Sequence, residues 1–155
     1  ISDFKAYENL IFGYHHQEPF SKSSILKDKD ILSHSYKAME EYDVRPLSPN
    51  LITSNFSGGN QQKIILSREL NENPKVLLVG QPTRGVDIGA IEFIHQRLID
   101  MRNKGTAILL VSVELEEILS LSDRIAVMFD GKIVGEKINQ DITDRDIGLL
   151  MAGIV

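Results

Sequence analysis

The chain has 155 residues and a formal net charge of −5 at pH 7, from 17 lysines and arginines against 22 aspartates and glutamates. This acidic balance disfavours a general electrostatic grip on nucleic acid or on an anionic membrane. Hydrophobic residues make up 42% and charged residues 25%, which is typical of a globular protein with a core. The sequence contains no cysteine, which excludes disulfides, thiolate metal sites and cysteine nucleophiles.

Residue 1 is isoleucine, whereas a natural bacterial chain normally begins with methionine. We therefore expect the sequence to be a processed product or a part of a longer protein. No apolar run in it reaches the ~18 residues that a membrane-spanning helix needs.

The first part of the chain is polar and is interrupted by several glycines and prolines, and we predict a helical domain over residues 1–72. Helices are expected at residues 3–12, 28–42 and 59–71. The second of them places Leu32, Tyr36 and Met39 on one face. Residues 14–27 are expected to form an exposed loop.

The second part, residues 73–155, alternates short apolar runs with helical patterns, which predicts an α/β layer. Strands are expected at residues 76–79, 107–111, 125–129 and 132–138, and helices at 88–104, 114–120 and 144–151. The first two strands are apolar throughout, which favours parallel strands buried on both faces. A helix joins them, so the connection should be a right-handed crossover. Asp130-Gly131 is typical of a hairpin turn.

A serine and two glycines open the third predicted helix, in the segment Phe56–Lys63 with the sequence FSGGNQQK. Free backbone N–H groups and the helix dipole favour an anion at such a place, and glycine lets a phosphate approach the backbone. The Ser57 hydroxyl and the amides of Gly59 and Asn60 are candidate phosphate donors. A capped helix after a flexible turn explains Ser-Gly-Gly alone, but capping does not need the Asn-Gln-Gln-Lys string that follows.

The segment FSGGNQQK resembles the signature motif of ATP-binding cassette (ABC) transporter ATPases, in the variant of the subset that imports simple sugars and nucleosides. Residues 75–87, KVLLVGQPTRGVD, resemble the Walker B strand and the D-loop of this family. Residues 106–131 resemble the switch-histidine region with the strands after it, and residues 146–153 the C-terminal end of the subset. The resemblance covers the whole chain in collinear order. It implies part of a P-loop NTPase-like α/β fold with a parallel sheet and a helical signature subdomain.

Three positions depart from the family pattern. The Walker B motif of the family ends in Asp-Glu, but Gly80 and Gln81 stand at these positions. Glycine offers magnesium no ligand, and glutamine cannot accept the proton of the attacking water, a loss that typically costs about 10²–10⁴-fold. Val113 stands at the position of the switch histidine. We therefore expect no intact catalytic residue and no metal ligand in this chain.

The remaining site residues follow from the same comparison. Asp87 matches the D-loop aspartate, which crosses the dimer interface in the family; it is equally suited to cap the helix from Ile88, and the two roles are compatible. The phosphate-binding loop, Gly-x-x-x-x-Gly-Lys-Ser/Thr, is missing, so the N-terminal part of the nucleotide-binding domain is expected to lie outside this sequence. His15 and His16 are adjacent on a predicted loop with no third ligand nearby, and we assign them no metal.

The resemblance implies the latter half of the second nucleotide-binding domain of an importer ATPase at the cytoplasmic face of the bacterial membrane. Its partners would be the first such domain of the same subunit, the transmembrane permease and, indirectly, a solute-binding protein, but no nucleic acid. The residues expected to contact ATP held by the first domain are Ser57, Gly58, Gly59, Asn60 and Gln61. ATP and Mg²⁺ would act in the longer protein, and the isolated chain should bind neither and be inactive. Two alternatives are a non-catalytic module that docks on the permease and a soluble ABC ATPase that serves no transporter.

Overall fold

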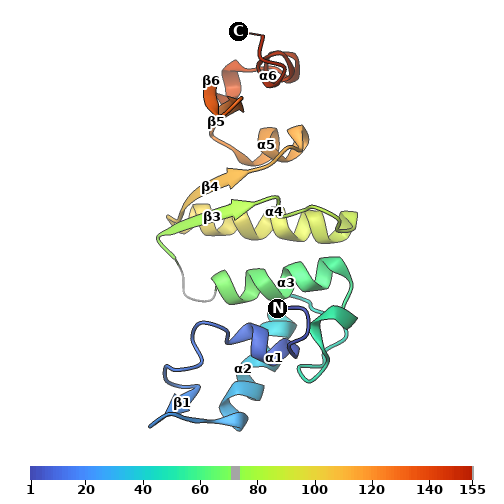
Figure 1. The fold of residues 1–155 in the computed structure, drawn as a ribbon, viewed down its shortest axis with the longest axis vertical. Coiled ribbons are helices and arrows are strands. Elements are labelled where there is room, and N and C mark those ends of the chain that lie inside the picture. Colours follow the sequence, from blue (N-terminus) through green and yellow to red (C-terminus); the bar gives the residue numbers. More distant parts are fainter. Residues whose placement is uncertain (71–73, 155) are drawn as a thin grey trace. The chain divides into compact units, whose positions relative to one another are not determined.

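The computed structural model describes residues 1–70 and 74–154 (Figure 1). The chain forms two compact units, one made of residues 1–77 and 82–107, the other of residues 78–81 with the segment from residue 108 onward. The expected division between a helical domain and an α/β core falls at residues 72 and 73, outside the described residues, and it stays a prediction.

The first unit is mainly helical. Its helices are α1 (Ala6–Leu10), α2 (Asp28–Glu41), α3 (Gly58–Leu70) and α4 (Ile88–Asn103), with a short 3₁₀ turn at Thr53–Asn55. Helix α1 packs against α2 and α3, and α3 packs against α4. The apolar side chains Ile94, Leu98 and Met101 of α4 are buried. These contacts hold α3, which carries the signature-like segment, from two sides.

Two predictions for the first unit are wrong. The helix expected over residues 3–12 spans only five residues, because Lys5 is extended and pairs with Ile52 as an isolated antiparallel bridge. The loop expected over residues 14–27 contains a small hairpin of β1 (Ser21–Lys22) and β2 (Ile25–Leu26). Ser23 and Ser24 adopt φ values of 49° and 65° in its turn, a conformation that Asn and Gly favour far more than Ser.

Strands β3 (Val76–Gly80) and β4 (Ala107–Val111) pair as a two-stranded sheet. The Ala107 N–H donates to Lys75 O at one end of the pair, and the Gln81 N–H donates to Val111 O at the other, so the strands run parallel as predicted. Burial on both faces is wrong, however. Alternate side chains are exposed, with 74% of Leu78 and 59% of Leu109 accessible. A continuous apolar run predicted a doubly covered sheet, and one face has no cover within the described residues.

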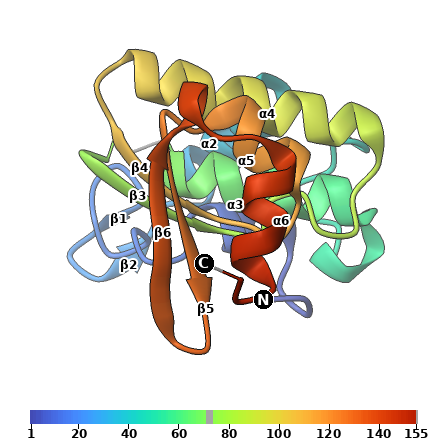
Figure 2. The same ribbon diagram turned by 90° about the horizontal axis from the view of Figure 1, so that it is seen from above.

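The second unit contains α5 (Leu115–Leu121), β5 (Arg124–Phe129), β6 (Lys132–Ile138), a 3₁₀ turn (Asn139–Asp141) and α6 (Asp144–Met151). Strands β5 and β6 form the predicted hairpin, with positive φ at Asp130 and Gly131. Helix α6 packs beside this hairpin (Figure 2). Ile147 of α6 lies in one buried cluster with Ile125 and Val127 of β5. Across the described part of the chain, every helix is too short or too polar to cross a bilayer.

Candidate functional site

The signature-like segment places an exposed loop at the start of a well-packed helix. Phe56 is buried and anchors the loop, whereas Ser57 and Gly58 are exposed. Helix α3 begins at Gly58, and its first complete turn is closed by the Gln61 N–H, which donates to Ser57 O at 2.9 Å. The N–H groups of the first turn have no carbonyl acceptor within a helix. Donors and the positive end of the helix dipole therefore meet at Ser57 and Gly58.

The Asn60 and Gln61 side chains are engaged inside the protein. The Asn60 carboxamide lies between two groups, with Oδ1 accepting from the Arg45 N–H at 2.7 Å and Nδ2 donating to Ser57 Oγ at 2.9 Å. The Gln61 Nε2 donates to Phe56 O at 2.8 Å. These bonds fix the loop from within, so the two side chains are not directed outward in this structure. Sequence spacing alone gave no sign of this orientation.

The two glycines of the segment lie close to the loop that precedes α4. A Cβ on Gly59 would lie 2.9 Å from the Ala90 Cβ and 3.2 Å from Asp87 Oδ2, and one on Gly58 would lie 3.1 Å from Gly85 O. Real side chains avoid such distances, so this close approach requires glycine at Gly59. The signature-like and D-loop-like segments are therefore neighbours in the first unit, although some 30 residues separate them in sequence.

Asp87 caps α4, as one of its two expected roles requires. Its Oδ1 accepts from the Ala90 N–H at 2.9 Å, and its own backbone is extended, as is usual at an N-cap. Its other carboxylate oxygen lies beside Gly59 and adds negative charge near the start of α3. The role across a dimer interface stays a prediction.

The three departures from the family pattern lie in the second unit, at the carboxyl ends of β3 and β4. Gly80 ends β3, and Gln81 follows with a φ of 50° while its N–H holds the end of β4 at Val111. Val113 lies two residues beyond that contact and is 63% exposed. None of the three side chains is a carboxylate or an imidazole, so these positions offer no ligand to Mg²⁺ and no general base.

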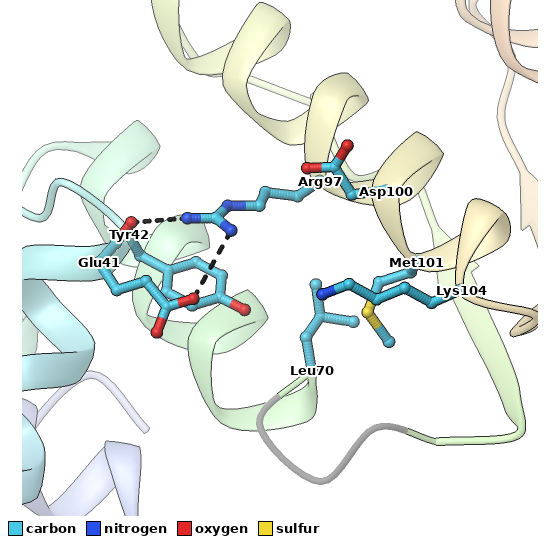
Figure 3. Close-up of a pocket in the computed structure, with 7 residues that line it drawn as sticks. All are labelled: Glu41, Tyr42, Leu70, Arg97, Asp100, Met101 and Lys104. Atoms are coloured by element: carbon cyan, nitrogen blue, oxygen red, sulfur yellow. Dashed lines mark hydrogen bonds and ion pairs between the residues drawn. The ribbon is translucent and has the colours of Figure 1, made fainter.

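A small pocket of about 210 Å³ lies in the first unit among the C-terminal parts of three helices (Figure 3). Its lining residues are Glu41, Tyr42, Leu70, Arg97, Asp100, Met101 and Lys104. Arg97 reaches from α4 to the end of α2, where it donates to Glu41 O at 2.7 Å and lies over the Tyr42 ring at 4.6 Å. The sequence did not predict this contact of Arg97 with Glu41 and Tyr42, because no motif in the sequence marks it.

Burial raises the pKa of the Tyr42 hydroxyl above its ordinary value, and the Arg97 charge opposes that rise.

His15 and His16 are exposed and line an open depression near the β1–β2 hairpin. Across residues 1–70 and 74–154 there is no group of three His, Cys, Asp or Glu side chains placed to hold a metal ion.

Comparison with known proteins gives strong matches in sequence and in structure. The chain is 44% identical over 153 residues to the guanosine import ATP-binding protein NupO of Bacillus subtilis, covering 99% of this chain and 30% of that protein. It is 48% identical over 146 residues to the nucleoside import ATP-binding protein NupA of Lactococcus lactis, covering 94% and 29%. The fold matches MJ1267, an ATP-binding cassette of an ABC transporter, with a TM-score of 0.74 at 24% identity, covering 99% of this chain and 63% of that one. No family model matches.

The fold is that of an ABC cassette, an α/β architecture of which this chain spans about 60% in the solved structures. The chain belongs to the ABC transporter ATP-binding proteins of the nucleoside and sugar importer group. It spans about 30% of the length of the curated relatives it matches.

Proposed function

We propose that this chain supplies the signature motif to an ATP molecule held by another nucleotide-binding domain of the same importer ATPase. The observation that carries the proposal is the exposed loop at Ser57 and Gly58 on the N-terminus of α3. Five residues make up the proposed contact: Ser57, Gly58, Gly59, Asn60 and Gln61. The hydroxyl of Ser57 and the backbone amides of the first turn would donate to phosphate oxygens, while the Asn60 and Gln61 side chains support the loop.

The chain's own catalytic half-site is proposed to be silent. Gly80, Gln81 and Val113 supply neither a Mg²⁺ ligand nor a base, so Mg²⁺ would be held with ATP by the other domain. The ATP site completed by the silent positions would bind nucleotide and hydrolyse it poorly. Asp87, beside Gly59, would reach across the interface between the two domains in addition to capping α4.

The transported molecule is proposed to be a nucleoside, with a simple sugar as the second candidate. The relative NupO is named for guanosine import, and the relative NupA is named for nucleoside import. Other relatives with lower identity are named for glucose, ribose and xylose import. The partners would be the permease subunits and, indirectly, a solute-binding protein, with this chain peripheral to the cytoplasmic face of the membrane.

A second candidate is a non-catalytic module that docks on the permease through the first helical region, with a vestigial nucleotide site. Exposed apolar side chains there, such as Phe12 and Ile25, favour it. A third candidate is a soluble ABC ATPase without a transporter, which the acidic charge and the relatives' names disfavour.

Calorimetric titration of the 155-residue chain with Mg-ATP tests the proposal. The chain should show no measurable binding, because its contacts to ATP complete a site whose main nucleotide-binding groups lie on another domain. Titration of the longer protein that contains this segment is the positive control. Micromolar binding by the 155-residue chain alone would overturn the proposal that it acts only on ATP held elsewhere.

A further inference from the structure

We propose that Asn60 is a positioning residue that turns the hydroxyl of Ser57 into a hydrogen-bond donor facing outward from the loop. The inference rests on the proposed function, since it concerns how Ser57 would meet a phosphate. It assigns to the Asn60 side chain a different task from direct contact with nucleotide, and it extends the site to the loop that follows α2, at residues 43–45.

The orientation of the Asn60 carboxamide follows from its partners. The Arg45 backbone N–H can only donate, so the oxygen Oδ1 of Asn60 must face it, at 2.7 Å. The amide nitrogen Nδ2 then faces Ser57 Oγ, at 2.9 Å, and can only donate. The Asn60 backbone N–H also points toward Ser57 Oγ, at 3.5 Å. The Arg45 backbone thus decides which end of the carboxamide meets the serine.

The Ser57 hydroxyl has one hydrogen to donate and two lone pairs to accept with. Because Asn60 Nδ2 donates to Ser57 Oγ, it occupies a lone pair and repels the hydroxyl hydrogen. The hydrogen therefore points away from Asn60. Ser57 is exposed, so the hydrogen is available to an oxyanion that approaches the start of α3. A donor oriented before the anion arrives needs no reorganisation when it binds.

The Arg45 N–H is itself held in place by contacts between its loop and α3. Lys63, one turn after Asn60, donates from Nζ to Asp43 O at 3.0 Å and pairs with the Asp43 carboxylate at 3.5 Å. Only 13% of the Lys63 side chain is exposed, and its ammonium lies 4.8 Å from the centre of the Phe93 ring. The loop after α2 is therefore tied to α3 at two successive places, Arg45 and Asp43.

Substitutions at Asn60 separate the two hydrogen bonds. Asn60→Asp keeps an acceptor for the Arg45 N–H but replaces the donor to Ser57 by a second acceptor, which would draw the hydroxyl hydrogen inward. Asn60→Ala removes both bonds. Gln62→Ala is the matched control, because Gln62 lies on the same turn of α3 and its side chain makes no hydrogen bond with the described residues.

The experiment measures two quantities in the longer ATP-binding protein that contains this segment: ATP turnover with its permease, and hydrogen exchange of the Arg45 amide without nucleotide. Asn60→Ala should speed exchange of the Arg45 amide about tenfold, whereas Asn60→Asp should leave it protected. Asn60→Asp should nevertheless lower kcat as much as Ser57→Ala does. In a Ser57→Ala background neither Asn60 change should lower kcat further.

Each possible outcome of this experiment either supports or overturns the inference. Unchanged turnover in Ser57→Ala would refute the proposed function and this inference with it. Reduced turnover in Ser57→Ala together with full turnover in Asn60→Asp would overturn only the inference. Further loss of turnover in the double variant would show that the charge of the new carboxylate acts directly on the nucleotide, which would also overturn the inference. An Arg45 amide that exchanges at the wild-type rate in Asn60→Ala would overturn the inference as well.

Discussion

Gly59 lies where any side chain would have to displace its neighbours, since a Cβ would come within 2.9 Å of Ala90. Alanine is favoured over glycine within a helix by about 1 kcal/mol, but overpacking costs about 1–3 kcal/mol. We therefore expect Gly59→Ala to lower the free energy of unfolding by about 1 kcal/mol in a denaturant titration. Gly80→Ala is the control, because a Cβ there meets no atom within 4 Å. Equal stability of the two variants would contradict the close packing of the two loops.

Asp43 gives the loop after α2 a dependence on pH. The hydrogen bond from the Arg45 side chain, and after it the Lys63 charge, hold the pKa of the Asp43 carboxyl below its ordinary value. A carboxyl with a lowered folded pKa adds stability above its unfolded pKa, and this stability is lost as pH falls through the folded value. Melting curves should show wild type above Asp43→Asn at pH 7, with the difference shrinking below about pH 4. A difference that is constant with pH would contradict this.

At this scale the sequence predicts residue types for the candidate site but not the directions of their side chains. Ser57 and the two glycines are predicted as candidate site residues because a phosphate-binding helix start favours those residue types, and this stays a prediction. The inward orientation of Asn60 depends on Arg45, which is 15 residues away and is brought close only by the packing of α2 against α3. The spacing of residues in the sequence does not indicate such a contact.

Helices α2 and α4 are joined by an aromatic and ionic anchor. The Arg97 guanidinium lies over the Tyr42 ring, at 4.6 Å from its centre, and donates to Glu41 O (Figure 3). It also lies 5.2 Å from the centre of the Phe93 ring. Lysine keeps the charge but loses the planar stack and the forked donor. Arg97→Lys should therefore lower the free energy of unfolding by about 1 kcal/mol.

Chemical denaturation measures this loss, with Glu92→Ala as the control, an exposed position on the same helix. If Arg97→Lys were as stable as wild type, the anchor would contribute no net stability. Any loss should be accompanied by weaker protection of amides at the end of α2, because Arg97 holds that carbonyl end directly.

Most elements could be predicted, because their signals are local. Strands β4 and β6 have the predicted bounds, since apolar runs and the Asp130-Gly131 turn mark them. The β1–β2 hairpin was missed because Ser23-Ser24 has no turn signature, and α1 was predicted too long because Lys5 pairs with a residue far along the chain. Elements that depend on contacts between residues far apart in the sequence cannot be predicted from local sequence patterns.

On the scale of the whole molecule, the exposed face of β3 and β4 is the clearest departure from expectation. Residues with high exposure there include Val76, Leu78, Leu109 and Val111. Their apolar character predicted burial on both faces, and that prediction used only the sequence of the strands themselves. This chain spans about 60% of the solved cassettes that it matches. The apolar composition of the strands favours a sheet covered on both faces, whereas the described residues leave one face of this strand pair exposed.

The proposed contact of Ser57 with ATP held by another domain is tested most directly by Ser57→Arg in the proposed longer ATP-binding protein. A bulky cation at the start of α3 would remove the hydroxyl donor and block close approach of a phosphate. Ser54→Arg, an exposed position three residues earlier, is the control for the added charge and bulk. With the permease present, we predict that Ser57→Arg lowers ATP turnover by about 10²-fold while Ser54→Arg leaves it near wild type. Wild-type turnover in Ser57→Arg would contradict the account.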